Sequence, residues 1–539
     1  MISTRKETDS DEGTKIILQG KAGVGKTYVI NVITELVNDY YNRVVGTDFK
    51  SNKVLLCAPT GIAAFLINGL TIHSAFSINT KYRKNICKLG DDLIGAIRQE
   101  HKDVKVIIAD EYSMISRTLR INMDKRCREI YGINNKSFGG KIVIFAGDLF
   151  QLPPVNDRAI YACSDYNNVN DYLYDQVWYD FELFELVEGV RQKHKEYQLL
   201  LDNFALGQLS KEHADLLKKR IVKSENDVPE DAIWVYYSNK EVNEFNDNRI
   251  AKAPGINYES IALDTIHIAQ DSKDKDKSSK DSIESNKLAI AKLYAQDISS
   301  NTKMRFNLLL KCELRYKLTS NVSVADGLAK SAMATLKRID FDKQTKKPAI
   351  VWLKFNDSNV GNTARQSCLE FMKENKIPLD LVPLRHYSET ITDIPNISIK
   401  IHHEAIRKQF PITLCEASTF HSTQGLSIPK LCIDSRKRDI KTDLAYVGLS
   451  RCDYEGLYLL GKIPEPKSRN QNLLNEVYRL RNASKLKLSY YNFEQDIGVK
   501  IVYHNVRSYK SHGVDVTAID WYWKADIIIL SEANVYNSE

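Results

Sequence analysis

The sequence predicts an α/β fold with parallel sheets and a phosphate-binding turn, and two observations predict it. Residues 13–192 alternate apolar strand patterns with helical patterns, which is typical of a parallel sheet covered by helices. Within this stretch the apolar run Lys15–Leu18 leads into the segment GKAGVGKT at 20–27, and a helical pattern follows it. A strand, a glycine-rich turn and a helix in this order form a cradle for phosphate groups.

The residue types of the turn fit nucleotide chemistry. Glycines let backbone N–H groups turn towards phosphate oxygens, and the start of the next helix adds a partial positive charge. Lys26 can reach the β- and γ-phosphates of ATP, and the Thr27 hydroxyl can bind Mg²⁺. A chance glycine-rich turn is the alternative, but the flanking strand and helix argue against it. The expected nucleotide contacts are Gly20, Ala22, Gly23, Val24, Gly25, Lys26 and Thr27.

Two further strand patterns end in polar residues that a nucleotide site needs. The first, 104–109, runs into Asp110 and Glu111, which could hold Mg²⁺ and orient an attacking water molecule. Strand-end carboxylates are also common helix caps, so this pair gains its meaning from the glycine-rich turn. The second, 141–146, leads to the segment GDLFQLPP, in which Gln151 is either a γ-phosphate sensor or an ordinary loop amide.

These segments, in this order, resemble the PIF-type DNA helicases, which are superfamily-one relatives of the RecD group. The resemblance covers roughly residues 13–463. It rests on GKAGVGKT, CAPTGIAA (57–64) with TIHSAF (71–76), IIADEYSMIS (107–116), FAGDLFQLPPV (145–155), LVEGVRQ (186–192), YYSNKEVNEFN (236–246), IRKQFPITLCEASTFHSTQGLSI (406–428) and AYVGLSR (445–451).

The resemblance implies an ATP-dependent motor that moves along single-stranded DNA, 5′ to 3′, and unwinds duplexes. It implies that Lys26 and Thr27 bind phosphate and Mg²⁺, that Asp110 holds the metal and that Glu111 positions water. Gln151 would sense the γ-phosphate, and the implied arginine fingers are Arg191 and Arg451; either arginine taken alone would be read as a solvated surface residue. The implied DNA contacts are Pro59, Thr60, His73, Thr419, His421 and Gln424, although the two histidines could merely cap helices.

The same resemblance divides the chain. We expect two RecA-like motor domains with the phosphate loop in the first, a small inserted β-barrel and a truncated C-terminal α/β segment. Residues 77–102 are either a wedge insertion or a solvated helix pair. The expected parts are 13–192 for the first motor domain, 193–315 with 400–463 for the second, 271–287 as a disordered loop within it, 316–399 for the insertion, 464–498 for a linker and 499–539 for the C-terminal segment.

The last 41 residues, 499–539, contain two strand patterns, one reaching Asn505 and the other Glu532. They resemble the opening of an exonuclease–endonuclease–phosphatase domain, where such an Asn and Glu approach Mg²⁺. Because the remaining acids and histidines of that family are missing, a complete nuclease site is not expected. An α/β appendage with an incidental Asn and Glu is the alternative. Helicases joined to such a domain resemble proteins of Helitron-type transposons, so we expect a fragment of one.

The chain departs from the family pattern in three places. Ser422 follows His421, so a lysine that could contact phosphate is missing. Around the insertion, Cys312-Glu313, Ala329-Lys330-Ser331 and Ala334 stand where the family has Gly and Asn, and a non-glycine residue at a left-handed turn is costly. The glutamine element that reads adenine in relatives is not found before the first strand. These departures leave open a second hypothesis, a DNA-binding remnant without motor activity.

Composition sets outer limits on function. The 539 residues suffice for several domains, and a net charge of +7 permits nucleic-acid binding without proving it. The longest apolar runs are of strand length, so no membrane span is expected. The nine cysteines show no paired spacing, which indicates reduced thiols and no zinc site. The expected partners are single-stranded and forked DNA, bound by a monomeric motor in DNA repair, recombination, telomere maintenance or transposition; the family implies a nuclear location.

Overall fold

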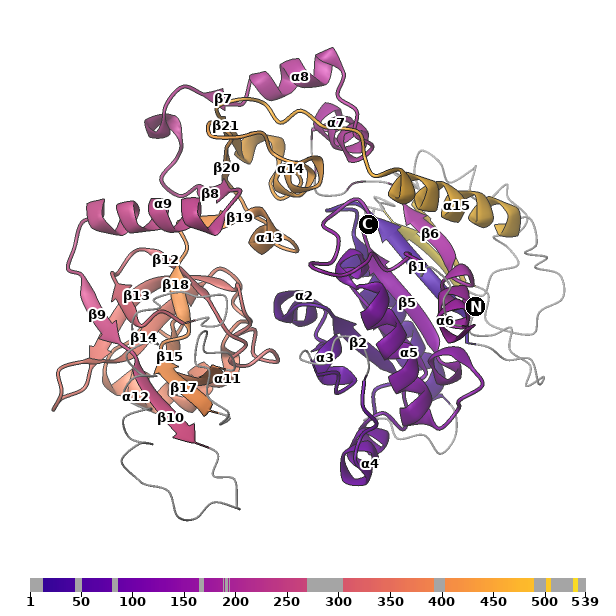
Figure 1. The fold of residues 1–539 in the computed structure, drawn as a ribbon. Helices are drawn as coiled ribbons and strands as arrows, with labels where there is room; N and C mark the ends of the chain where they lie inside the picture. The colour runs from indigo at the N-terminus through magenta and orange to yellow at the C-terminus, as the bar shows by residue number, and fades with distance from the viewer. Residues whose placement is uncertain are drawn as a thin grey trace, which may run out of the picture.

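The computed structural model of the protein contains two large parallel sheets, a set of antiparallel sheets and a short parallel pair of strands (Figure 1). It describes residues 13–43, 51–79, 86–163, 169–187, 189, 192, 194–268, 304–391, 403–488, 501–505 and 527–531. We call residues 13–187 the first body, residues 194–252 with 415–463 the second body, and residues 258–414 the β-body. In the described part of the chain, no helix has the length and apolar character that crossing a membrane requires.

The first body is a six-stranded parallel sheet with helices packed on it, as the sequence predicts. Its central strands are buried along their whole length, which explains their nearly continuous runs of Val, Ile and Leu. In spatial order the strands are β3 (Leu70–Thr71), β2 (Val54–Ala58), β4 (Val106–Ala109), β5 (Ile142–Gly147), β1 (Lys15–Gly20) and β6 (Glu182–Leu186). The helices are α1 (Lys26–Asn42), α2 (Gly61–Leu66), α3 (Ile72–Ala75), α4 (Asp91–Glu100), α5 (Arg117–Tyr131) and α6 (Val169–Tyr179).

The second body repeats the parallel arrangement with five strands. Two motifs that lie far apart in the sequence become neighbours here, because β19 pairs with β8. The strand order is β19 (Ala417–Thr419), β8 (Ile233–Tyr236), β20 (Leu431–Asp434), β21 (Leu457–Leu460) and β7 (Ile221–Val222). The helices are α7 (Lys195–Ala205), α8 (Lys211–Lys218), α9 (Asn239–Lys252), α13 (Phe420–Thr423) and α14 (Thr442–Leu449).

The β-body is larger than the insertion expected from the sequence. Strands β9 (Tyr258–Ile261), β10 (Leu263–Ile268) and β11 (Asn307–Leu310) fall in the range assigned to the second motor domain, yet they form antiparallel pairs. β10 pairs with β17 (His403–Gln409), and buried Asp264 and Arg407 form an ion pair of 2.8 Å between these strands. The other elements are β12 (Arg315–Leu318), β13 (Met333–Phe341), β14 (Pro348–Phe355), α11 (Asn362–Ser367), α12 (Leu369–Glu374), β15 (Val382–Leu384), β16 (Tyr387–Ile391) and β18 (Ile412–Leu414).

After β21 the chain returns to the first body. Helix α15 (Gln471–Leu488) lies along β6, where Arg481 binds both carboxylate oxygens of Glu185 at 2.6 and 2.9 Å (Figure 1). We call residues 461–470, which connect β21 to α15, the strap. The C-terminal strand patterns form the parallel pair β22 (Ile501–Asn505) and β23 (Ile527–Ser531). The expected loop 271–287 and residue Glu532 lie outside the described residues.

The insertion at 77–102 contributes the helix α4 to the described structure. Ile94 and Ile97 of α4 are buried, and Arg98 donates to the carbonyls of Glu129 and Ile130 on α5 at 2.9 Å. These contacts attach α4 to the first body. Residues 80–85 lie outside the description, so the wedge hypothesis stays a prediction.

The two departures around the insertion fall on left-handed backbone. Glu313 has φ 68° and Ser331 has φ 75°, the conformation in which glycine is favoured because a Cβ atom is strained there. At both positions a non-glycine residue holds a backbone conformation that favours glycine.

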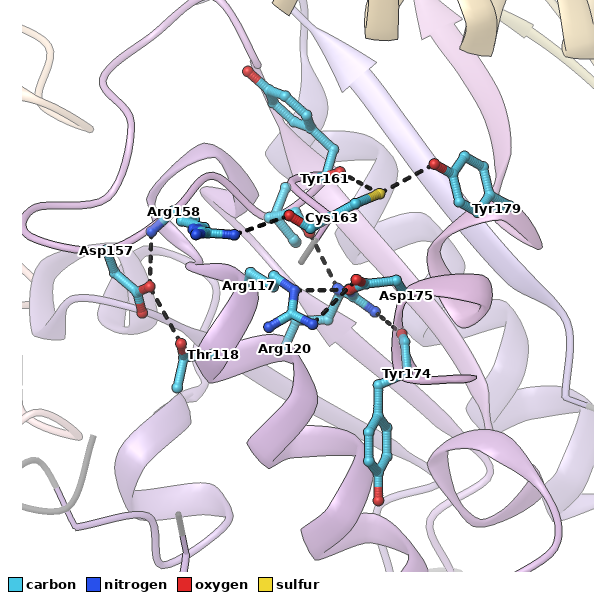
Figure 2. Close-up of polar contacts among 11 residues, drawn as sticks. Arg117, Thr118, Arg120, Asp157, Arg158, Tyr161, Cys163, Tyr174, Asp175 and Tyr179 are labelled. Atoms are coloured by element: carbon cyan, nitrogen blue, oxygen red, sulfur yellow. Dashed lines mark hydrogen bonds and ion pairs between the residues drawn. The ribbon is translucent and has the colours of Figure 1, made fainter. Parts of the chain in front are cut away.

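A buried ionic cluster joins α5 to α6 in the first body (Figure 2). The Asp175 side chain is 1 % exposed and accepts hydrogen bonds from Arg117 at 2.7 and 3.1 Å and from Arg120 at 3.4 Å. Arg120 also donates to the carbonyls of Ile160 and Tyr174, at 3.1 and 2.8 Å. Burial lowers the pKa of Arg120 to about 10, so the guanidinium stays charged near neutral pH. One buried carboxylate thus contacts two cations.

Replacing Asp175 by alanine is expected to destabilise the first body strongly. Removing one partner of a buried ion pair costs about 3–5 kcal/mol, because the remaining charge is left uncompensated. The measurement is the free energy of unfolding from chemical denaturation. Asp215→Ala is the control, since Asp215 pairs with Lys218 at the surface and its loss should cost less than about 1 kcal/mol. Equal effects of the two substitutions would contradict the role given to the cluster.

Ser331→Gly is expected to raise the thermal stability, by about 1 kcal/mol or less in unfolding free energy, because glycine relieves the left-handed strain. Ala332→Gly is the matched control, since Ala332 is not among the described residues with positive φ. That change should instead lower the stability by about 0.4–1 kcal/mol through the entropy of the unfolded chain. Loss of stability in both variants would show that Ser331 is not strained.

Candidate nucleotide site between the two parallel sheets

The phosphate loop has the geometry that its sequence predicts. It leaves β1 at Gly20, and Gly23 and Gly25 adopt φ values of 84° and 86°, which only glycine takes up without strain. A Cβ atom on Gly20 would lie 2.6 Å from a methyl group of Val24, so this position also needs glycine for space. The Lys26 Nζ atom donates to the carbonyls of Gly20 and Lys21 at 2.7 and 2.9 Å. The ammonium group of Lys26 is therefore held against the backbone of the phosphate loop.

A pocket of about 330 Å³ opens at this loop and collects most of the residues predicted for the nucleotide site. Leu66 and Ala63 of α2 also line it, and Gly425 enters from the second body. Gly20 and Val24 belong to the phosphate loop but do not line the pocket. Arg191 lies outside the described residues. The predicted residues in the lining are Ala22, Gly23, Gly25, Lys26, Thr27, Asp110, Glu111, Gln151 and Arg451.

The acid pair Asp110 and Glu111 at the end of β4 combines a raised pKa with a left-handed backbone. Asp110 is 8 % exposed, and its Oδ1 atom is buried without a hydrogen-bond partner among the described residues. Burial, followed by repulsion from Glu111, raises the pKa of Asp110 to about 7, although nearby Lys26 opposes the shift. Glu111 has a left-handed backbone, with φ 54° and ψ 44°. Strain of this kind concentrates at functional sites, where the surrounding structure maintains it.

Gln151 and Arg451 meet across the boundary between the two bodies. Gln151 lies in the loop after β5, and Arg451 follows α14 of the second body. Both side chains are buried, and the Arg451 Nη2 atom donates to the Gln151 Oε1 atom at 3.4 Å. Arg451 is further fixed by the Val447 carbonyl at 3.0 Å and the Ser450 hydroxyl at 2.9 Å. Its guanidinium group is thereby directed at the pocket of the other body.

Asp148, which the sequence analysis did not single out, organises this boundary. It is fully buried and accepts hydrogen bonds from Gln19 at 3.0 Å, from the Phe150 backbone N–H at 3.1 Å and from Gln151 at 3.4 Å. The hydroxyl of Tyr446 on α14 donates to it at 2.8 Å. Both residues stand inside quoted motifs, GDLFQLPP and AYVGLSR, so their position beside Gln151 and Arg451 was the available signal.

The predicted DNA contacts lie at the carboxyl ends of strands in both sheets. Thr60 follows β2 and caps α2, accepting from the Ala63 N–H at 3.3 Å, and Thr419 ends β19. Ligands of open parallel sheets bind at this edge. His421 is exposed, whereas the pKa of His73 is lowered by burial. The other residues of the predicted set are Pro59 and Gln424.

Gln424 occupies a place that the sequence did not indicate. Its Nε2 atom donates to the Glu111 Oε2 atom at 3.3 Å, and Gly425 beside it lines the nucleotide pocket. The motif expected to contact DNA therefore also touches the acid pair of the first body.

Comparisons with known proteins agree with this geometry. The family described as PIF1-like helicase matches residues 3–207. The chain is 28 % identical to an ATP-dependent DNA helicase Pif1 of Psychrobacter, over 83 % of this chain and 66 % of that protein. It is 24 % identical to the ATP-dependent DNA helicase RRM3 of Saccharomyces cerevisiae, over 81 % of this chain and 61 % of that one. The chain thus spans about three fifths to two thirds of the length of these relatives.

Solved structures support the fold. The Pif1 helicase of Candida albicans superposes with a TM-score of 0.60 at 19 % identity, covering 87 % of this chain and 96 % of that one. A Bacteroides Pif1 bound to single-stranded DNA superposes with a TM-score of 0.55 at 20 % identity, covering 89 % and 95 %. The two parallel sheets are RecA-like, with a phosphate loop in the first. Residues 3–207 thus match the PIF1-like helicase family, and over most of its length the chain is similar to Pif1 and RRM3 helicases.

Proposed function

We propose that this protein is an ATP-dependent DNA helicase that moves 5′ to 3′ along a single strand. One observation carries the proposal. A single pocket joins the phosphate loop and acid pair of the first body to Arg451 of the second, with Gln151 and Arg451 in contact at 3.4 Å. A site divided between two bodies hydrolyses ATP only when the bodies approach each other. Hydrolysis is thereby coupled to their relative movement.

The first body supplies binding and water activation in this proposal. Lys26 exchanges the loop carbonyls at 2.7 and 2.9 Å for phosphate oxygens of ATP. The Thr27 hydroxyl and the Asp110 carboxylate would hold Mg²⁺, and the unpartnered Asp110 Oδ1 atom fits that use. When bound, Mg²⁺ neutralises charge that develops on the phosphate oxygens. Glu111 orients the water molecule that attacks the γ-phosphorus and accepts its proton.

The second body supplies the charge that completes the site. Gln151 contacts the γ-phosphate, and Arg451, released from Gln151, stabilises the negative charge of the transition state. Loss of the γ-phosphate removes these contacts, and the bodies can then separate. Arg191 is proposed as a second arginine finger on the resemblance alone.

The DNA strand is proposed to lie across the carboxyl edges of both sheets, on Pro59, Thr60, His73, Thr419, His421 and Gln424. Thr60 and Thr419 occupy equivalent places at the ends of β2 and β19, so one strand can span the two bodies. The 3.3 Å contact between Gln424 and Glu111 offers a direct link between this strand and water activation. Relatives described with single-stranded DNA and with forked duplex DNA make both kinds of DNA reasonable substrates.

The biological setting follows from the activity. DNA repair, recombination, telomere maintenance and transposition all require strand separation, and we propose that the chain acts in one of them as a monomeric motor. Matched relatives come from a bacterium and from fungi and animals, so the family works on both bacterial and eukaryotic DNA. A nuclear location is proposed for a chain of eukaryotic origin.

Unwinding of tailed duplexes, with Lys26→Ala as the inactive variant, tests the proposed function. The wild-type chain should unwind a duplex with a 5′ single-stranded tail in the presence of ATP and Mg²⁺, and should leave a 3′-tailed duplex intact. Lys26→Ala should abolish ATP hydrolysis and unwinding while single-strand binding persists. Lys21→Ala is the matched control, since Lys21 lies in the same loop but pairs with Asp202.

Two results of this test would contradict the proposed function. Full ATPase activity in Lys26→Ala would show that the nucleotide site is assigned wrongly. Binding to single strands without hydrolysis by the wild-type chain would favour a DNA-binding remnant over a motor.

Arg451→Ala should lower the turnover number for ATP by roughly 10³-fold or more, because an arginine finger typically contributes roughly 10³–10⁵ in rate. Binding of ATP should stay largely intact, because the phosphate loop belongs to the other body. Steady-state hydrolysis and equilibrium binding of a fluorescent nucleotide measure the two effects separately. Arg438→Ala, at an exposed position of the same body, is the control and should hydrolyse ATP like the wild type. A parallel loss of binding and turnover in Arg451→Ala would contradict the finger role.

A further inference from the structure

The strap places a cation beside the loop that carries Gln151, from a part of the chain outside every quoted motif. Arg469 donates from Nε to the Ala205 carbonyl at the end of α7, at 2.8 Å, and from Nη2 to the Phe150 carbonyl, at 3.0 Å. Its guanidinium group lies 6.0 Å from the ring centre of Phe150 and 5.7 Å from that of Tyr446. One side chain thus contacts the helix that begins the second body, the sensor loop and the arginine-finger helix.

The Phe150 carbonyl belongs to the peptide unit that also contains the N–H group of Gln151. Arg469 holds this unit from the carbonyl side, while the Gln151 N–H donates to the Asp148 carbonyl at 3.1 Å. The peptide that carries the predicted γ-phosphate sensor is therefore fixed at both ends. A change at Arg469 would free the carbonyl side of this peptide and let the Gln151 side chain turn.

The second contact of Arg469 reaches the predicted finger. Tyr446, which lies against the guanidinium group, donates to Asp148 at 2.8 Å and belongs to α14, the helix that Arg451 follows. Cation–π attraction in a buried setting is stronger than at an exposed one. Burial lowers the pKa of Arg469, which is consistent with a guanidinium group removed from water.

The strap is anchored on both sides of Arg469, so this side chain is presented rigidly. Before it, the backbone N–H of Lys467 donates to the Thr442 hydroxyl at 2.8 Å, and that hydroxyl donates to the Lys467 carbonyl at 3.1 Å. After it, α15 is fixed on the first body through Trp178, whose Nε1 atom donates to Glu476 at 2.8 Å, and through the Arg481–Glu185 pair. The strap thus begins on the second body and ends on the first.

We propose that Arg469 is a positioning residue that holds Gln151 and Arg451 in the alignment needed for ATP hydrolysis. It acts through the Phe150–Gln151 peptide and through Tyr446 rather than by touching the nucleotide. The strap ties this alignment to the placement of α15. This inference rests on the proposed function, since it concerns the ATP site of the same motor.

The test compares Arg469→Ala and Arg469→Lys with the wild type in single-strand-stimulated ATP hydrolysis and in nucleotide binding. Arg479→Ala is the matched control, because Arg479 also lies on the chain after β21 but binds Glu476 and Tyr179 away from the pocket. Fluorescent ADP measures the concentration of folded sites, and rates are divided by it. Any loss of folded protein is thereby separated from loss of catalysis.

Arg469→Ala should lower kcat at least tenfold while KM for ATP and the affinity for ADP stay within twofold of the wild type. The affinity for ADP–aluminium fluoride, which mimics the transition state, should fall in proportion to kcat. Arg469→Lys should recover part of both, because lysine keeps the charge but donates to fewer carbonyls. Arg479→Ala should match the wild type in every readout.

Two results would overturn the inference. One is an Arg469→Ala variant with wild-type kcat, and the other is an equal loss of affinity for ADP and for ADP–aluminium fluoride, which indicates general damage. A wild-type chain that hydrolyses no ATP would overturn the proposed function itself, so the two failures are distinguishable.

Discussion

The structure depends on a small polar contact between two bodies, in which Tyr446 and Arg451 of one meet Asp148 and Gln151 of the other. Asp148 is fully buried and is held by hydrogen bonds that come from both sides of the boundary. A buried carboxylate is stabilised by each hydrogen bond that it accepts, so the bond from Tyr446 favours the arrangement in which the two bodies meet. Separation of the bodies has to break that bond. The stability of the buried Asp148 carboxylate therefore depends in part on the placement of the second body.

Left-handed backbone at non-glycine residues occurs both beside the nucleotide site and far from it. Glu111 adopts a left-handed backbone beside Asp110, whose pKa is raised to about 7 by burial. Such features persist where surrounding packing maintains them, and they concentrate at functional sites. Glu313 and Ser331 are also left-handed, but they lie in the β-body and line no part of the nucleotide pocket. A left-handed non-glycine residue therefore does not by itself identify a functional site.

Much of the fold and of the nucleotide site could be predicted from the sequence, because both depend on local patterns. Apolar runs gave the strands β1, β4 and β5, and GKAGVGKT gave the loop with its left-handed glycines. Pairings between distant segments could not be predicted in the same way. β10 joined the β-body because its partner β17 lies more than a hundred residues later, and Arg469 has no local pattern that reveals the Phe150 carbonyl as its acceptor.

The most direct test of the divided site is the rate of ATP hydrolysis by the purified chain as single-stranded oligonucleotide is added. A strand that lies on both bodies should draw them together and bring Arg451 and Gln151 to the γ-phosphate. The rate should rise severalfold or more and saturate with the oligonucleotide concentration. A rate that is high without DNA and unchanged by it would contradict the claim that hydrolysis depends on closure of the two bodies.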